Sequence, residues 1–144
     1  MRRIKILYID SNIFIFASTN KGKLGQNCRK IIKLTNEHKI SCATSFLVLD
    51  EVMWVLKKNI GRESAIKIIK AILSMPIKWI DVDKSIMINT IEIFEKTKLD
   101  PRDSIHIASM KKMGLSTIIS EDNDFDKIKG IERLNIMKCL EKNQ

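Results

Sequence analysis

The chain has 144 residues, of which 44% are hydrophobic, and it carries 26 basic against 17 acidic residues, a formal net charge of +9. A chain of this size can bury a substantial core unaided, so we expect one domain over residues 1–144, with a polar tail from about 136. Three cysteines without any C-x-x-C or Cys/His pattern exclude a disulfide framework and a zinc site. The positive charge favours encounter with nucleic acid.

The amino terminus does not have the pattern of a signal peptide, because Lys5 and Asp10 interrupt its apolar segment. No uninterrupted apolar stretch approaches the roughly 18 residues that are needed to span a bilayer. We therefore expect a cytoplasmic protein with no membrane association, whose cysteines are buried thiols.

The first third of the chain alternates apolar and amphipathic segments. Residues 4–10 (IKILYID) predict a strand, and residues 11–19 predict a short helix. A loop with two glycines follows over 20–25. Helical spacing over 26–39 then leads into a short strand at 40–43.

The middle of the chain predicts two helices, a strand and a third helix. Apolar residues at three- and four-residue intervals indicate a helix over 45–59, which Gly61 ends, and a second helix over 62–74. A short apolar strand at 77–81 and an amphipathic helix over 84–98 follow.

The last third begins with a helix that Pro101 opens and Gly114 ends. A strand is predicted at 115–120, a charged turn over 121–130 and a last short strand at 131–135. Strands separated by helices imply a parallel sheet with helices on both faces. The predicted fold is therefore an α/β/α sandwich with a central parallel sheet of four to five strands.

Acidic residues recur at the ends of apolar segments. Asp10 ends the first predicted strand, and Asp122 lies just past another. Asp103 falls in the first turn of its helix, and Glu51 lies on the core-facing side of a different helix. Because active sites of parallel sheets lie at the carboxyl ends of the strands, these side chains are candidates for one site. A cation should neutralise such a cluster; otherwise we expect the carboxylates to be repelled, protonated or bridged by a basic residue.

Carboxylate oxygens are the ligands that Mg²⁺ and Mn²⁺ prefer. The sequence has no glycine-rich phosphate loop and no serine-nucleophile motif. A phosphatase that uses Asp10 as phosphoryl acceptor is disfavoured, because Asn12 stands where a D-x-D motif needs its second acid. The acidic cluster in a basic chain favours metal-assisted hydrolysis of phosphodiesters.

Four motifs that together cover nearly the whole chain resemble those of the PIN-domain nucleases, in particular the VapC-like toxin ribonucleases. They are YIDSNIFI with Asp10 and Asn12, LVLDEVMWVL with Glu51, DPRDSIHIASM with Asp103, and IISEDNDFDKI with Asp122. The order and spacing of all four make the resemblance specific.

The resemblance implies a pocket in which Asp10, Glu51, Asp103 and Asp122 are catalytic and hold Mg²⁺ or Mn²⁺. Asp124 is the alternative to Asp122 in the fourth position.

Two polar residues are expected to support this pocket. Asn12 resembles the family's polar residue that steadies Asp10 or contacts the substrate, and Ser120 would orient a ligand by a hydrogen bond. For His106, one turn after Asp103, we expect a packing or supporting role. Basic residues near the ends of the Glu51 and Asp103 helices would hold an RNA backbone or form ordinary solvated helix ends: Lys57, Lys58, Arg62, Lys111 and Lys112.

By this resemblance the chain is a metal-dependent endoribonuclease that hydrolyses RNA with a metal-activated water, and the toxin of a type II toxin-antitoxin pair. The implied partners are RNA, a second copy in a homodimer and a small antitoxin protein. The alternative is a catalytically weak PIN module that binds RNA or a protein partner.

Overall fold

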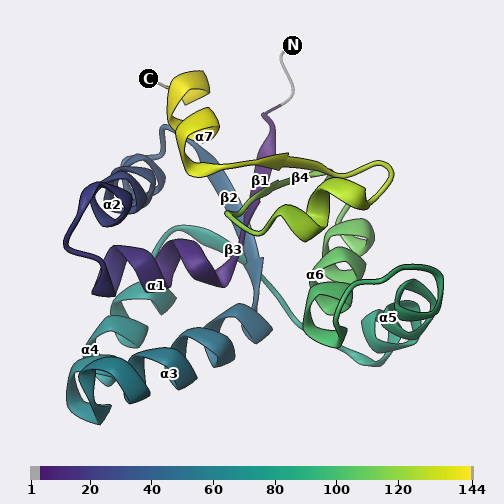
Figure 1. The fold of residues 1–144 in the computed structure, drawn as a ribbon, viewed down its shortest axis with the longest axis horizontal. Coiled ribbons are helices and arrows are strands. Elements are labelled where there is room, and N and C mark those ends of the chain that lie inside the picture. The colour runs from purple at the N-terminus through teal and green to yellow at the C-terminus, as the bar shows by residue number, and fades with distance from the viewer. Residues whose placement is uncertain (1–3, 144) are drawn as a thin grey trace.

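The computed structural model describes residues 4–143, which build an all-parallel, five-stranded sheet between two layers of helices (Figure 1). The strands are β1 (Ile6–Ile9), β2 (Ser41–Ser45), β3 (Ile77–Ile80), β4 (Thr117–Ile119) and β5 (Glu132–Leu134). They lie in the order β3-β2-β1-β4-β5. The predicted α/β/α sandwich with four to five parallel strands is confirmed.

The sheet is built outward from β1 in two directions, with β2 and β3 on one side of it and β4 and β5 on the other. Tyr8 of β1 pairs with Ala43 of β2 on one side and with Ile118 of β4 on the other. The connections leaving β1 and β4 therefore diverge at the carboxyl ends of these two strands. In open parallel sheets this divergence creates the crevice in which ligands bind.

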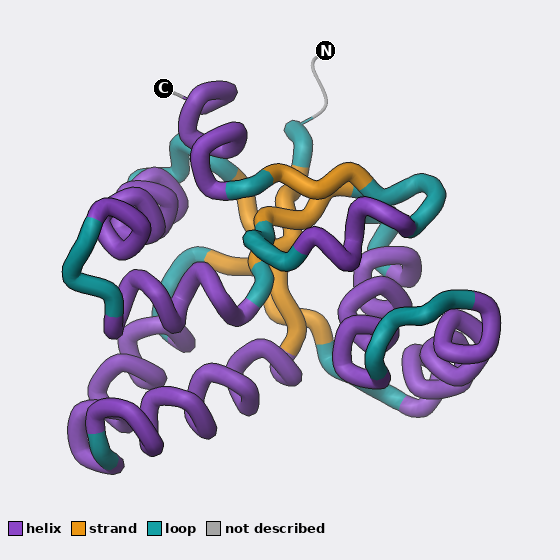
Figure 2. The backbone as a smooth tube through the Cα atoms, in the orientation of Figure 1, coloured by secondary structure: helices purple, strands orange, loops and turns teal. Residues whose placement is uncertain are grey.

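The helices cover both faces of the sheet. They are α1 (Ser11–Thr19), α2 (Lys23–Asn36), α3 (Phe46–Ile60), α4 (Arg62–Leu73), α5 (Lys84–Lys96), α6 (Pro101–Lys112), the 3-10 segment η1 (Asn123–Lys127) and α7 (Ile136–Asn143). Helices α1 to α4 lie on one side, and α5 and α6 lie on the other (Figure 2). None of the helices in residues 4–143 has the length and apolar character to cross a membrane.

All three cysteines are buried thiols, as predicted. Cys28 lies on α2, Cys42 on β2 and Cys139 on α7. Burial raises the pKa of Cys28 and Cys42 to about 12 and the pKa of Cys139 to about 11, so the three thiols stay protonated at neutral pH.

The segment from residue 136 differs from the predicted polar tail, because it forms α7. Ile136, Cys139 and Leu140 are buried, and their spacing of three and four residues puts them on one helix face. The carboxylate of Glu121 accepts a hydrogen bond from the backbone N–H of Ile136 at 2.8 Å and so secures the start of the helix. Polar residues between the buried positions mask this pattern in so short a segment.

The corner between α1 and α2 also differs from the prediction, since α2 begins at Lys23 within the expected loop of residues 20–25. The Asn20 side-chain oxygen accepts hydrogen bonds from the N–H groups of Gly22 and Gly25, at 2.9 and 3.0 Å. A Cβ at Gly25 would lie 1.8 Å from the backbone oxygen of Asn20. Only glycine therefore fits at this close approach, which fixes α2 against α1.

Candidate metal centre

Asp10 occupies the point where β1 ends and α1 begins. It is 5% exposed, and its Oδ1 accepts a hydrogen bond from the backbone N–H of Ser11 at 2.8 Å, which makes it the N-cap of α1. A carboxylate at a helix N-terminus is stabilised by the unpaired N–H groups and the helix dipole. The N-terminus of α1 therefore stabilises the negative charge of Asp10 at the end of the buried strand β1.

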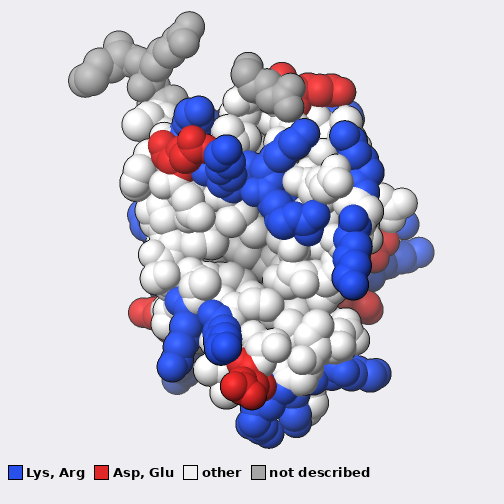
Figure 3. Space-filling view, turned by 90° about the vertical axis from the view of Figure 1, so that its left-hand side faces the viewer, with Lys and Arg blue, Asp and Glu red and all other residues white. Residues whose placement is uncertain are grey.

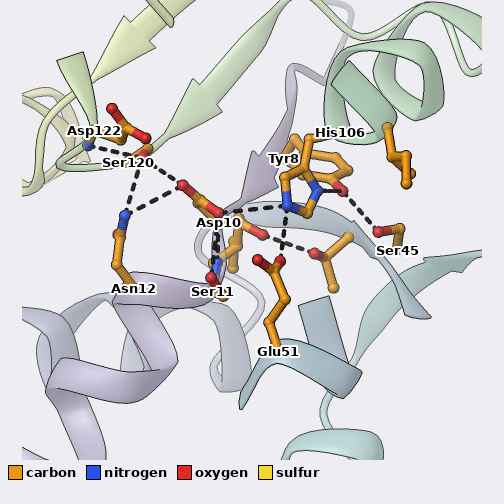
Figure 4. Close-up of polar contacts among 12 residues, drawn as sticks. Tyr8, Asp10, Ser11, Asn12, Ser45, Glu51, His106, Ser120 and Asp122 are labelled. Carbon is orange, nitrogen blue, oxygen red and sulfur yellow. Dashed lines mark hydrogen bonds and ion pairs between the residues drawn. The ribbon is translucent and has the colours of Figure 1, made fainter. Parts of the chain in front are cut away.

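The other oxygen of Asp10 is held by Asn12 and Ser120 (Figure 4). Ser120 Oγ donates to Asp10 Oδ2 at 2.6 Å, and Asn12 Nδ2 donates to the same oxygen at 3.2 Å. Asn12 Nδ2 also lies 3.1 Å from Ser120 Oγ. Both predicted supporting residues therefore contact Asp10 directly.

Burial raises the pKa of Asp10, and the nearby charge of Glu51 adds to this. The positive charge of His106 and the hydrogen bonds from Ser120 and Ser11 oppose the rise without cancelling it. The carboxylate is consequently costly to keep ionised, and a further positive charge beside it would stabilise it.

His106 lies between Glu51 and Asp10. Its Nε2 is 2.9 Å from Glu51 Oε1 and 3.8 Å from Asp10 Oδ1, and its ring is fully buried. The expectation that a basic residue bridges the carboxylates is met by this ring. The sequence predicts only a packing or supporting role for His106, whereas its contact with Glu51 makes it a central part of the cluster.

The second nitrogen of His106 contacts a buried hydroxyl pair. Its Nδ1 lies 2.7 Å from the Tyr8 hydroxyl, which donates to Ser45 Oγ at 2.9 Å. A hydroxyl can donate or accept, so the hydrogen of the Tyr8–His106 contact belongs to either group, depending on the protonation of the ring. The other nitrogen, Nε2, is directed at the Glu51 carboxylate, to which it donates a hydrogen.

The surrounding carboxylates raise the pKa of His106. Burial by itself lowers the pKa, but the hydrogen bond with Glu51 and the charges of Asp10, Glu51 and Asp103 outweigh burial. Protonation of the ring would balance part of the negative charge of the cluster.

A second acidic group adjoins the first. Asp103, in the first turn of α6, and Asp122 and Asp124, after β4, can bring one carboxylate oxygen each to within 4.8 Å of one another. Asp10, Glu51 and His106 form the other such group. Burial, followed by the charges of Asp10 and Asp122, raises the pKa of Asp103 to about 7, which indicates that the two groups share one negative potential.

Asp122 and Asp124 differ in their surroundings. Asp122 is half-buried, and its backbone N–H donates to Ser120 Oγ at 3.0 Å. Its Oδ1 accepts from the backbone N–H of Asp124 at 2.9 Å, whereas Asp124 itself is exposed. Asp122 is therefore the better ordered of the two candidates for the fourth position.

Arg133 secures the loop that carries Ser120 and Asp122, a role that the sequence analysis did not find. Its guanidinium forms a bidentate salt bridge with the Asp126 carboxylate, with N–O distances of 2.8 and 2.9 Å. It also donates a hydrogen bond to the backbone oxygen of Ser120 at 3.0 Å. Arg133 lies on β5 and Ser120 directly follows β4, so this hydrogen bond links the two ends of the connection between these strands.

The acidic cluster opens into a surface hollow of about 470 Å³, lined by Glu51 and residues 100–103. The exposed Arg102 is the one basic residue of that lining. Among the predicted basic flanks, Lys112 instead donates to Asp83 and Ser85, both at 2.6 Å. Lys57 lies over the ring of Trp54, 5.6 Å from its centroid.

The arrangement can hold a divalent cation in chemical terms. Carboxylates from four separate elements supply hard oxygen ligands, and the raised pKa of Asp103 reflects negative charge that a cation would offset. His106 adds one nitrogen to the donor set, although that nitrogen is already directed at Glu51.

The PIN domain family model matches residues 7–131, and the chain belongs to this family. A comparison with curated proteins returned no match.

Solved structures with the same fold include several toxin-antitoxin proteins. A structure of DNA-bound VapBC from Salmonella typhimurium has a TM-score of 0.72 at 20% identity, over 93% of this chain and 99% of that chain. VapBC2 from Rickettsia felis, bound to a fragment of its promoter DNA, has a TM-score of 0.71 at 16% identity, over 90% and 98%. The sarcin-ricin loop cleaving toxin VapC20 of Mycobacterium tuberculosis has a TM-score of 0.70 at 17% identity, over 85% and 93%. At these identities the likeness is one of fold.

Proposed function

We propose that the chain is a Mg²⁺- or Mn²⁺-dependent endoribonuclease that hydrolyses RNA phosphodiester bonds with a metal-activated water. The observation that carries this proposal is a pair of adjoining acidic groups, Asp10 with Glu51 and Asp103 with Asp122, where the connections of β1 and β4 diverge. Membership of the PIN family supports it, and the four motifs that resemble this family contain these four acids.

The four carboxylates would be the cation ligands. A divalent ion bound there lowers the pKa of a coordinated water and offsets charge on the phosphodiester. The chain prepares these ligands by fixing them: Ser120 and Asn12 hold Asp10, and His106 holds Glu51. Ligands that are already oriented lose little conformational entropy when the ion binds.

Arg102 is suited to contact the substrate backbone. It is exposed and lines the same hollow as Glu51 and Asp103. A guanidinium pairs with phosphate oxygens through parallel hydrogen bonds. We propose that Arg102 binds the phosphodiester next to the carboxylates, which would otherwise repel the negatively charged phosphate.

The biological role that fits this chemistry is the toxin of a toxin-antitoxin pair. Support comes from the shared fold with proteins crystallised as VapBC and as a toxin-antitoxin complex from Klebsiella pneumoniae. A small antitoxin protein and a second copy in a homodimer are the partners we propose. The toxin role would be supported by a neighbouring gene that encodes a small DNA-binding protein, if that protein co-purifies with this chain. Analytical ultracentrifugation of the purified chain would give its oligomeric state.

The direct test is RNA cleavage. The purified chain is incubated with total cellular RNA and with structured hairpins, in Mg²⁺ or Mn²⁺, beside the Asp10→Asn and Asp103→Asn variants. Asp50→Asn is a matched control, because Asp50 is a half-buried acid beside Glu51 on α3 without a recorded hydrogen bond or ion pair within residues 4–143. We expect cleavage by the unmodified chain and the control, with a loss of at least about 100-fold in the two site variants.

Cleavage that persists in both site variants would reject the carboxylates as the catalytic machinery. Absence of cleavage with every RNA and both ions, together with no uptake of Mn²⁺ in calorimetry, would favour a binding module instead.

A further inference from the structure

A group of basic side chains lies on α2 and the corner that precedes it. Residues 21–39 contain six basic residues (Lys21, Lys23, Arg29, Lys30, Lys33 and Lys39) and one acidic residue, Glu37. Helix α7 packs beside α2 and adds Lys138 and Lys142. Figure 3 views the side of the molecule that carries these helices, and basic side chains gather in its upper part, at the height of α2 and α7. We call Lys23, Lys30 and Lys33 the α2 basic surface.

The three lysines of this surface are exposed, and within residues 4–143 none of them forms an ion pair. On α2, Lys30 lies seven residues after Lys23 and three residues before Lys33, so the three share a helix face. Unpaired cations in a row repel one another, and a polyanion that binds them relieves this repulsion.

The surface has a fixed position relative to the carboxylates. Asp10 caps the start of α1, and Asn20 at its other end begins the corner to α2. A helix of nine residues is about 13 Å long. Because the backbone contact at Gly25 fixes α2 against α1, α2 begins about the length of α1 away from Asp10.

We propose that the α2 basic surface is a second RNA-binding site, which holds the phosphate backbone of a long RNA while another part of the strand lies at the carboxylates. The choice of RNA as the polyanion rests on the proposed function. The contacts are to phosphates, so binding there is independent of sequence and sensitive to salt.

The test measures RNA binding by fluorescence anisotropy, with the full chain in EDTA. The probes are a labelled tetranucleotide and a labelled RNA of about 20 nucleotides. Lys30→Glu with Lys33→Glu should weaken binding of the long RNA about tenfold or more near 0.1 M salt and lower the salt slope by about 1.4. Binding of the tetranucleotide should not change.

A control variant changes the net charge equally at a different place. Lys78→Glu with Lys129→Glu alters two exposed lysines that form no ion pair within residues 4–143, and it should change long-RNA affinity less than about threefold. Lys30→Gln with Lys33→Gln, a milder change that keeps the surface polar, should give an intermediate loss.

Equal losses in the control and the α2 variants, or unchanged affinity in both α2 variants, would overturn the proposal. Preferential binding of duplex DNA or of poly-glutamate through Lys30 and Lys33 would overturn it as well. Lysine-dependent RNA binding by a chain that never cleaves RNA would leave this inference standing and reject the nuclease function. Cleavage of RNA by the chain, combined with unchanged RNA affinity in the Lys30 and Lys33 variants, would reject this inference and leave the nuclease function standing.

Discussion

His106 Nε2 lies 2.9 Å from Glu51 Oε1, and through its other nitrogen the same ring contacts the Tyr8 hydroxyl at 2.7 Å. A helix on one side of the sheet, a helix on the other side and the central strand are thereby joined through one buried imidazole ring. The ring both orients a carboxylate of the candidate site and connects the two helical layers.

Replacing His106 by Ala should destabilise the chain, because the Glu51 carboxylate loses its hydrogen-bond partner and the buried Tyr8 hydroxyl keeps only Ser45. We expect the free energy of unfolding to fall by about 2–4 kcal/mol, measured by urea unfolding in EDTA. In the Glu51→Gln background the same replacement should cost about 1–3 kcal/mol less. Strictly additive effects of the two substitutions would contradict the described pair.

Asp10→Asn should abolish stabilisation by divalent ions. The amide keeps an oxygen that can accept from the Ser11 N–H, so we expect the helix cap to survive. Saturating Mn²⁺ should raise the melting temperature of the unmodified chain by about 5 °C and leave that of the variant unchanged. Asp50→Asn should retain the full increase; if it also loses the increase, the ion binds elsewhere.

The stability of the chain without a divalent ion should depend on the protonation of Asp103. Its pKa is raised from 3.8 to about 7, so protonated Asp103 favours the folded state. This contribution is fully present below pH 3.8 and is lost as the pH rises through about 7. The raised pKa of His106 acts in the same direction.

Between about pH 6 and about pH 8 we therefore expect the free energy of unfolding to fall by an amount on the order of 1 kcal/mol in EDTA. Asp103→Asn should make this pH dependence shallower, as followed by urea titrations at each pH. A variant with the same slope as the unmodified chain would show that other groups control it.

Gly25→Ala should be severely destabilising, because its Cβ would lie 1.8 Å from the Asn20 backbone oxygen and the two helices would have to separate. A loss of about 2 kcal/mol or more in urea unfolding is expected. Gly22→Ala is the matched control, since its Cβ would lie 3.4 Å from the Asn20 side-chain oxygen. Comparable losses in both variants would mean that the corner is not closely packed.

The parallel sheet was predictable because its evidence is local: short apolar runs alternate with amphipathic segments of helical spacing. The position of Asp10 was predictable for the same reason, as it directly follows such a run. Helix α7 was not recognised, since its pattern extends over only two turns, and the start of α2 was masked by a glycine that serves close packing instead of a loop.

The connections within the site depend on contacts between distant parts of the sequence. His106 meets Glu51 across 55 residues and Tyr8 across 98 residues. Periodicity gives no information on which side chains meet across the sheet. The hydrogen bond from Arg133 to the backbone oxygen of Ser120 could not be predicted either, because every residue has a backbone carbonyl group and the sequence does not show which one accepts.

The buried thiols provide built-in reporters of local opening. Cys139 on α7 and Cys28 on α2 are fully enclosed, so an alkylating reagent can modify them only when their helices detach. Partial opening of the last helix would label Cys139 well before Cys42, which belongs to the central sheet. The order in which the three thiols react would therefore map which layer of the sandwich loosens first.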